Sequence, residues 1–550
     1  MRPQPKGAQL GAVESDAETL LVVAPPGCGK TEVLAMRAEW LLRNGAVPPG
    51  RRLLAVTFTN RARDNLRHRL TNQLGERTLR SSVTVANFHE LSARILDAHY
   101  RLVGLEPGYQ FPKPAWTRKT LNDITKDTGR QRHALDVLGR LKRQALSDDE
   151  VIARLEEDDE QDALRFEVRR AEENWLDYSD MPRYAQLIMR NDRVANVFQS
   201  HFHAVLVDEF QDLSTQQYEL VQRLCARRST FVGDPYQGIF SWAGAEPSAV
   251  FEDLRTRADQ TIELDVSFRS SPAVLEVVNA IAVPLGSAAL SAAEPESWAH
   301  GGHAYAARYA TDVAEADGIV SLTDYLARKY PDDTIGVICR AVYRRGAVER
   351  AYERAKSTPH FGDISLDTPR IARLLKLHAR HVDEGLSFAE QIEDLRFRVC
   401  SSLVQQDIDT AKEVDEGCDQ LREHEDAGLS VRQLVARLRD HTVVSAISPG
   451  VHVLNAHVGK GQQFDWVVVM GMEEGHIPSY YSKTDADYLE DRRVLLVMAS
   501  RARKGLIITR AVNTKNKYGK SFRQEPSRWW AAIAEGCKEM PAAIAKLMKV

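Results

Sequence analysis

The sequence contains no uninterrupted apolar run of about 18 residues, the length that a membrane-spanning helix needs. Its first residues, MRPQPKGAQLGAVESDAETL, also lack the apolar core of a secretory signal peptide. Both absences argue against a membrane protein and against an exported one. We therefore expect a protein without membrane contacts that acts in the cytoplasm.

Cysteine is scarce, with 6 residues in a chain of 550. The cysteines are scattered, and they form neither a Cys-x-x-Cys pair nor a spacing typical of a zinc site. Reduced thiols of a cytosolic protein are therefore expected, rather than a disulfide framework. The six positions are Cys28, Cys225, Cys339, Cys400, Cys418 and Cys537.

Neither sign of charge dominates, because 73 Lys and Arg residues face 77 Asp and Glu residues, a formal net charge of −4. Which partners a protein attracts depends on where its charges lie and not on its net charge. Basic side chains follow Phe58 and gather again near residues 501–528, whereas acidic side chains are concentrated in stretches such as 147–160. The near-neutral sum therefore does not exclude a nucleic-acid partner.

Short apolar runs bounded by turn residues are the main structural signal. Such runs are typical of buried parallel strands, and segments with helical periodicity, such as 31–43, lie between several of them. The pattern predicts an α/β fold with two groups of strands. The runs are 20–24, 53–58, 204–207, 230–232, 335–339, 451–454, 466–470 and 506–509.

Two long segments interrupt the α/β pattern, at residues 96–199 and 351–449. Both read as helical and charged, and neither is rich in proline, glycine or serine, so we interpret them as inserted domains rather than linkers. The expected division is a first core (1–95 and 200–262), a helical insert (96–199), a second core (263–350 and 450–550) and a second, reduced helical insert (351–449).

The segment LLVVAPPGCGKT (20–31) has the form of a strand, a glycine turn and a helix start. Gly27, Cys28 and Gly29 form a turn whose backbone N–H groups can face an anion at the helix N-terminus. Lys30 would reach the β- and γ-phosphates, and the Thr31 hydroxyl would ligate Mg²⁺. The segment predicts a nucleotide-binding loop.

An acidic pair follows the apolar run 204–207. Asp208 is placed to hold Mg²⁺ through water, and Glu209 to orient and deprotonate an attacking water. A solvated turn is the alternative for two adjacent acids, but a position directly after a buried strand disfavours it. The long separation from Lys30 requires an inserted domain between the two motifs.

A series of motifs resembles, in order, those of UvrD/Rep/PcrA-like superfamily 1 DNA helicases. The resemblance implies two RecA-like cores of the P-loop NTPase class, ATP and Mg²⁺ as cofactors, and 3′–5′ movement on single-stranded DNA or a tailed duplex. The matching segments are TFTNRAR (57–63), DEFQD (208–212), VGDPYQGIFSWAGA (232–245), SFRSS (267–271), HVGKGQQF (457–464), EDRR (490–493) and ASRA (499–502).

The resemblance also implies roles for single residues around the nucleotide. On the base side, Gln9 would read adenine, Phe268 would stack on it, and Gln463 would lie near the ribose, where the family usually has a glutamate. On the phosphate side, Gln237 would sense the γ-phosphate and link it to the DNA-binding loop. Arg269 and Arg501 would close on the γ-phosphate from the second core.

A further group of residues matches DNA-facing positions of the family. Aromatic rings stack on bases and polar groups hold the backbone of a single strand, which suits this set. The group comprises Phe58, Thr59, Asn60, His89, Phe240, Trp242 and His457.

Some features depart from the family pattern. Ala243 and Leu496 replace a usual arginine and a usual tyrosine, the second insert is short, and we find no nuclease motif. With its short second insert, the chain also resembles the helicase-like subunit of Gabija-type anti-phage systems. The alternative is therefore a DNA-sensing ATPase subunit that regulates a separate nuclease and barely unwinds DNA. DNA repair and antiviral defence both stay open as pathways, and a P-loop ATPase unrelated to nucleic acid is a third hypothesis.

Overall fold

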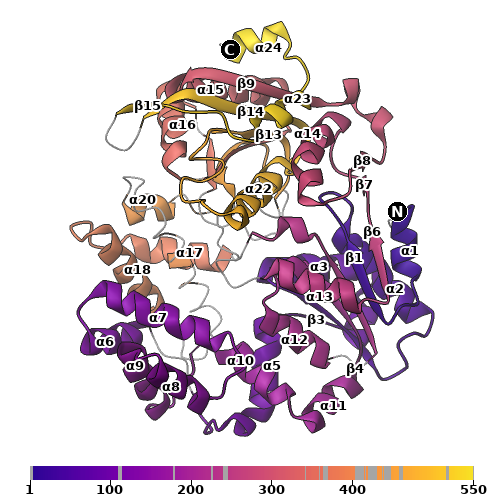
Figure 1. The fold of residues 1–550 in the computed structure, drawn as a ribbon, viewed down its shortest axis with the longest axis vertical. Helices are drawn as coiled ribbons and strands as arrows, with labels where there is room; N and C mark the ends of the chain where they lie inside the picture. The colour runs from indigo at the N-terminus through magenta and orange to yellow at the C-terminus, as the bar shows by residue number, and fades with distance from the viewer. Residues whose placement is uncertain are drawn as a thin grey trace.

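The computed structural model of the protein shows two α/β cores and two groups of helices (Figure 1). No helix in the described part of the chain is both long and apolar enough to span a membrane. The described residues are 4–109, 114–177, 180–224, 227–239, 246–340, 342–357, 359–362, 369–402, 414, 417, 418, 421, 430–436, 438, 447–456, 462–515 and 520–548.

The first core is built on a parallel sheet of six strands in the order β3-β2-β4-β5-β1-β6. Four of the predicted apolar runs lie in this sheet, and their prediction is confirmed. The edge strand β6 was not anticipated because it is polar and largely exposed, as an edge strand can be. The strands are β1 (Thr19–Val23), β2 (Arg52–Thr57), β3 (Val83–Asn87), β4 (Phe202–Asp208), β5 (Arg228–Gly233) and β6 (Gln260–Glu263).

Helices cover both faces of the first sheet. Leu20 and Val22 of β1 pack with α2 on one face, whereas Leu21 and Val23 pack with α5 and α10 on the other. This alternation follows from the two-residue period of a strand. The helices of this core are α1 (Ala8–Glu14), α2 (Lys30–Arg43), α3 (Asn60–Leu74), α4 (Glu76–Ser82), α5 (Phe88–His99), α10 (Asp180–Met189), α11 (Asp192–His201), α12 (Thr215–Leu224) and α13 (Pro247–Arg257).

The second core contains the order β11-β12-β10-β13-β14-β15, and β9 also pairs with β14. Among the strand pairs of this sheet that the structure describes, only β14–β15 is antiparallel. The other four predicted runs lie in this sheet, which confirms the α/β prediction with two parallel-sheet cores, and β11 lies inside the range 351–449. The strands are β9 (His303–Thr311), β10 (Thr334–Cys339), β11 (His360–Gly362), β12 (Gly450–Asn455), β13 (Phe464–Val469), β14 (Ala502–Lys515) and β15 (Ser521–Arg523).

Helices α15 and α16 pack on one face of the second sheet. Helices α14 and α22 pack on the opposite face, where one continuous apolar cluster joins them to α2 and β1 of the first core. The two cores are therefore packed against each other. The elements of this part are α14 (Pro272–Ala282), α15 (Asp312–Lys329), α16 (Val342–Ala355), α22 (Asp485–Ala499), α23 (Trp530–Glu535), α24 (Ala542–Met548), and the short pair β7 (Val266–Ser267) and β8 (Ser291–Ala292).

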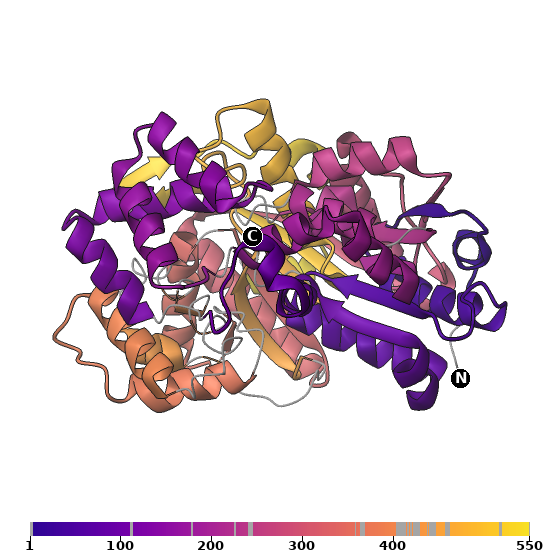
Figure 2. The ribbon, with the colours of Figure 1, turned by 90° about the horizontal axis from the view of Figure 1, so that it is seen from below.

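The remaining helices form two groups with apolar cores of their own. Both groups lie on the same side of the molecule in two perpendicular views (Figures 1 and 2), and α18 contacts α6. The first group is α6 (Pro114–Ile124), α7 (Thr128–Lys142), α8 (Asp148–Glu157) and α9 (Gln161–Glu172); the second is α17 (Pro369–Ala379), α18 (Phe388–Ser402) and α20 (Val431–Ala436).

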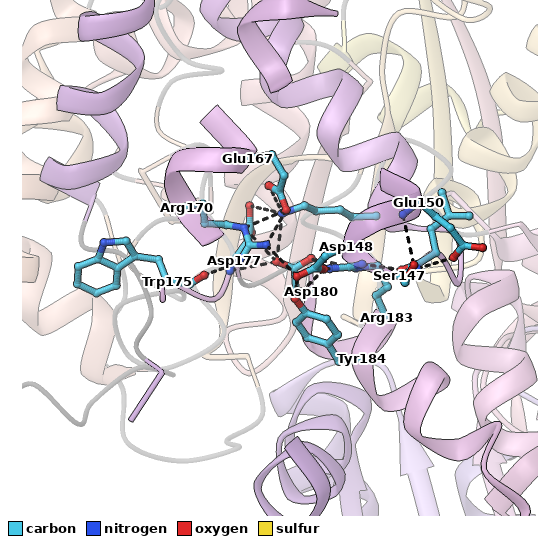
Figure 3. A network of polar contacts seen from close by, with 12 residues as sticks. Ser147, Asp148, Glu150, Glu167, Arg170, Trp175, Asp177, Asp180, Arg183 and Tyr184 are labelled. Carbon is cyan, nitrogen blue, oxygen red and sulfur yellow. Dashed lines mark hydrogen bonds and ion pairs between the residues drawn. The ribbon is translucent and has the colours of Figure 1, made fainter. Parts of the chain in front are cut away.

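A buried network of charges lies where the first helical group meets α10 (Figure 3). The Lys142 ammonium lies 2.8 Å from Glu167 and 3.1 Å from Asp180. Arg183 pairs with Asp180 at 2.7 Å, and Arg170 pairs with Glu167 at 2.6 Å. Such a network contributes little net stability, but removing one partner is costly, because it leaves a buried charge without its counter-charge.

Replacing Asp180 with asparagine is expected to lower the free energy of unfolding by about 3–5 kcal/mol, because buried cations lose their counter-charge. Burial raises the pKa of Asp180, but Lys142 and Arg183 outweigh burial and hold that pKa below its ordinary value. The carboxylate therefore stabilises the fold above the unfolded pKa of about 3.8, and this contribution is lost as the pH falls further.

Urea unfolding between pH 3 and pH 7 measures the effect. Asp149→Asn serves as the matched control, because Asp149 is exposed on α8, and surface changes usually shift stability by less than about 0.5 kcal/mol. Equal stability of the two variants at pH 7 would contradict the assignment of Asp180 to a buried network that needs its charge.

Candidate functional site

The turn between β1 and α2 has the backbone shape of a phosphate-binding loop. Gly27 and Gly29 have φ angles of +85° and +82°, the left-handed region that glycine adopts without strain. A Cβ atom on Gly27 would lie 2.3 Å from the Ser267 hydroxyl, so no larger residue fits there. The Lys30 ammonium donates to the Ala24 carbonyl at 3.1 Å, beside the turn. The predicted loop residues are therefore gathered around one concave turn.

The Thr31 hydroxyl donates to Asp208 Oδ2 at 3.0 Å, which joins the start of α2 to the end of β4. The other oxygen, Oδ1, is buried and has no hydrogen-bond partner among the described residues. Burial, reinforced by the Glu209 charge, raises the pKa of Asp208 to about 7. A desolvated carboxylate with a free oxygen beside a hydroxyl fits Mg²⁺, which prefers oxygen ligands.

The described part of the chain contains no group of three His, Cys, Asp or Glu residues that would hold a metal by itself. A Mg²⁺ ion that binds together with a nucleotide needs only one or two protein oxygens, because phosphates and waters complete its coordination shell.

Glu209 follows the strand in an unusual backbone conformation, with a φ angle of +57°. Non-glycine residues in this region are strained and are often found at functional sites. Its Oε2 atom accepts a hydrogen bond from Gln211 Nε2 at 2.6 Å, and Gln211 Oε1 accepts one from the Asp234 N–H at 2.9 Å. The conformation and these two bonds position the carboxylate at the carboxyl edge of the sheet.

Gln211 and Asp234 were not among the residues predicted for the site. Both lie inside the quoted motifs, and the signal that could have found them is the requirement for a partner that orients a catalytic carboxylate. Gly233 explains the close approach, since a Cβ atom there would lie 2.4 Å from Gln211 Oε1.

A hydrogen bond crosses between the cores at the predicted sensor residue. Gln237 Nε2 donates to Asp234 Oδ2 at 2.6 Å, and Gln237 Oε1 accepts from Arg501 Nη2 at 2.9 Å. Arg501 is 4% exposed. Burial, and then repulsion by Arg269, lowers the pKa of Arg501 to about 9. The structure therefore brings Gln237 and the buried cation of Arg501 together from two cores.

Arg269 is a second cation near Arg501. Burial lowers its pKa to about 10, and its Nη1 donates to the Ser500 carbonyl at 3.4 Å. The neighbouring Phe268 N–H donates to the Gly27 carbonyl at 2.9 Å, so this segment lies against the phosphate-binding loop. Two arginines with depressed pKa values beside a lysine form a site that a polyphosphate would stabilise.

The residues predicted for the base lie at the outer side of the loop. Gln9 Nε2 donates to the Cys28 carbonyl at 2.8 Å, and Gln9 Oε1 accepts from the Lys6 N–H at 3.1 Å. The Phe268 ring is 42% exposed, and the Lys6 ammonium lies 5.9 Å from its centroid. Gln463 is exposed beside Gln462, whose carbonyl accepts from Arg501 Nη1 at 3.5 Å. Gln9 and Phe268 are thus brought to the loop, and Gln463 lies near Arg501.

The DNA-facing candidates of the first core lie at the carboxyl ends of β2 and β3, which are neighbouring strands. Thr59 caps α3 by accepting from the Ala62 N–H at 3.1 Å. Asn60 Oδ1 accepts from Asn87 Nδ2 at 2.6 Å, which ties the first residue of α3 to the N-cap of α5, the helix whose first turn contains His89. Phe58 precedes Thr59 at the same edge.

These contacts bring four of the seven candidates, Phe58, Thr59, Asn60 and His89, onto one edge of the first sheet. The other three, Phe240, Trp242 and His457, lie outside the described residues. Asn87 was missed as a member of this group, although its place at the start of a helix after an apolar run is a capping signal.

Comparison with known proteins places both halves of the chain in one family. A family model described as the UvrD/REP helicase N-terminal domain matches residues 6–256, and one described as the UvrD-like helicase C-terminal domain matches residues 368–513. The chain is 25% identical to the ATP-dependent DNA helicase PcrA of Staphylococcus epidermidis over 633 residues, which covers 96% of this chain and 86% of that protein.

Two further relatives are also DNA helicases. DNA helicase II of Escherichia coli is 24% identical over 638 residues, covering 96% of this chain and 87% of that protein. The ATP-dependent DNA helicase Rep of Salmonella typhimurium is 30% identical over 286 residues, covering 49% of this chain and 42% of that protein.

Proposed function

The chain belongs to the UvrD/REP helicase family, and on this premise we propose that it is an ATP-dependent DNA helicase that translocates along single-stranded DNA. The observation that carries the proposal is the bond between Gln237 and Arg501, which links the two cores beside the phosphate-binding loop. A nucleotide bound there contacts both cores, so its hydrolysis changes how the cores hold each other.

The proposed chemistry uses residues that the structure brings together. The backbone N–H groups of the glycine turn and the Lys30 ammonium bind the phosphates. Thr31 and Asp208 would hold Mg²⁺, which would supply positive charge to offset that of the phosphates. Glu209 takes the proton of the attacking water. Arg269 and Arg501 stabilise the negative charge that develops on the transferred phosphoryl group.

The DNA side of the proposal rests on the edge formed by Phe58–Asn60 and His89. Phe58 offers a ring on which a base stacks, and the amide and hydroxyl groups suit a sugar-phosphate backbone. Family resemblance assigns contacts with the same DNA strand to Phe240, Trp242 and His457. The 3′–5′ direction of movement is likewise assigned by family resemblance. Alternating grips of the two cores on the strand would convert ATP turnover into movement.

Tailed duplexes test this function. We expect single-stranded DNA to raise the ATPase rate, and a duplex with a 3′ tail to be unwound faster than one with a 5′ tail. No stimulation by DNA would contradict the proposal as a whole. Strong stimulation without unwinding by the isolated chain, together with co-purification of a nuclease, would favour the alternative of a DNA-sensing subunit that regulates a nuclease.

A further inference from the structure

Arg37 is a buried cation behind the nucleotide site, about two turns along α2 from Lys30. Its side chain is 1% exposed. Nη1 donates to three backbone carbonyls, those of Ala12 at 2.9 Å, Val13 at 3.2 Å and Ser15 at 3.0 Å. Among the described residues Arg37 forms no ion pair, so helix-end carbonyls supply most of its compensation.

The three carbonyls belong to the C-terminal end of α1 and to the residues directly after it. α1 has only seven residues, and its N-cap, Gly7, provides no side-chain cap. A helix of this length is not stable by itself, so its place depends on tertiary contacts. Arg37 therefore anchors one end of α1, while Gln9 lies near the other end and bonds to the Cys28 carbonyl.

Arg37 also reaches the central sheet, because its Nε donates to Thr230 Oγ1 at 2.8 Å. Thr230 lies on β5, the strand that leads to Asp234 and Gln237. One guanidinium thus joins α2, which carries the phosphate-binding residues, to α1, which carries Gln9, and to the strand of the γ-phosphate sensor. The planar fork of arginine can make these bonds in different directions, whereas lysine cannot.

We infer that Arg37 is a positioning residue for base selection: by holding the end of α1, it sets where Gln9 meets the base of the nucleotide. This inference rests on the proposed use of ATP. It adds to that proposal a residue that contacts no part of the nucleotide. Loss of the anchor should loosen Gln9 while the phosphate contacts of Lys30 and Thr31 persist.

Equilibrium binding of fluorescently labelled ATP and GTP to Arg37→Lys tests the inference. We expect the affinity for ATP to fall by about tenfold, the equivalent of losing one or two buried hydrogen bonds, and the affinity for GTP to change by less than about twofold. The preference for ATP over GTP falls accordingly. In a Gln9→Ala background, Arg37→Lys should cause no further loss of preference, because Arg37 acts through Gln9.

Two more variants separate the role of Arg37 from a general effect on the helix. Thr230→Val removes only the hydrogen bond between Arg37 Nε and Thr230 Oγ1 and leaves the cation in place. It should therefore lower the preference for ATP over GTP, but less than Arg37→Lys does. Arg43→Lys on the same helix is the control, because Arg43 is exposed and pairs with Glu39. Folding of each variant is checked by its thermal unfolding midpoint.

An equal loss of affinity for both nucleotides, or an unchanged preference, would overturn the inference, since general loosening of the site affects ATP and GTP alike. Nucleotide binding is measured apart from hydrolysis because the two measurements test different proposals. Absence of DNA-stimulated hydrolysis in the unchanged protein would contradict the proposed function. The preference for ATP over GTP in binding decides the role of Arg37.

Discussion

Glu209→Gln is expected to lower the kcat of DNA-stimulated ATP hydrolysis by about 10²–10⁴-fold, the usual contribution of a general base. Glutamine has the shape of glutamate but cannot accept the proton of the attacking water. The hydrogen bond between Gln211 and position 209 can persist, so the backbone conformation with positive φ should be kept. ATP affinity should therefore stay within about threefold of that of the unchanged protein.

Phosphate release in the presence and absence of single-stranded DNA measures this effect, and binding of a fluorescent ATP analogue measures affinity. Glu252→Gln is the matched control, because Glu252 is an exposed glutamate on α13 of the same core. If Glu209→Gln turned ATP over at the normal rate, the assignment of Glu209 as the base would be wrong.

Arg501→Ala is expected to reduce DNA-stimulated hydrolysis by about 10³–10⁵-fold, the range measured for arginines that stabilise a phosphoryl-transfer transition state. The side chain is buried, and it is held by the Val497 carbonyl at 2.9 Å and by Gln237 at 2.9 Å. The loss removes both the cation at the γ-phosphate and the bond between the cores. Arg501→Lys should recover only part of the rate, because lysine cannot make the forked contacts.

The comparison of Arg501→Ala with Arg503→Ala separates this role from general charge. Arg503 lies two residues away, is 46% exposed and pairs with Asp465 at 3.1 Å. Its loss should leave turnover nearly unchanged. Normal DNA stimulation in Arg501→Ala would show that the second core does not contribute to catalysis in the proposed way.

The sequence predicted the strands that carry continuous apolar runs, and all eight predicted runs lie in the two sheets. It did not reveal β9, in which tyrosine and arginine interrupt the alanines, or β6, which is polar. Both strands form by pairing with residues far away in the chain, β9 with β14 and β6 with β1. Register with a distant strand cannot be read from local composition.

The candidate site also contains residues that local sequence pattern predicts and residues that depend on distant partners. Lys30, Thr31, Asp208 and Glu209 could be proposed as site residues from the sequence, because phosphate and Mg²⁺ chemistry demands those residue types directly after a buried strand. Arg37 could not, because it works through hydrogen bonds to partners that only folding brings near. The assignments of Phe240, Trp242 and His457 remain predictions from resemblance.

The sequence by itself therefore determined the fold class, and it predicts the nucleotide-binding loop and the acidic pair, since these depend on local pattern and on the order of motifs. Tertiary structure alone decided that Arg501 meets Gln237, that Arg37 anchors α1, and that buried charges join the first helical group to α10. The physical reason is burial: a charge removed from water must find partners in space, and those partners lie on other elements of the fold.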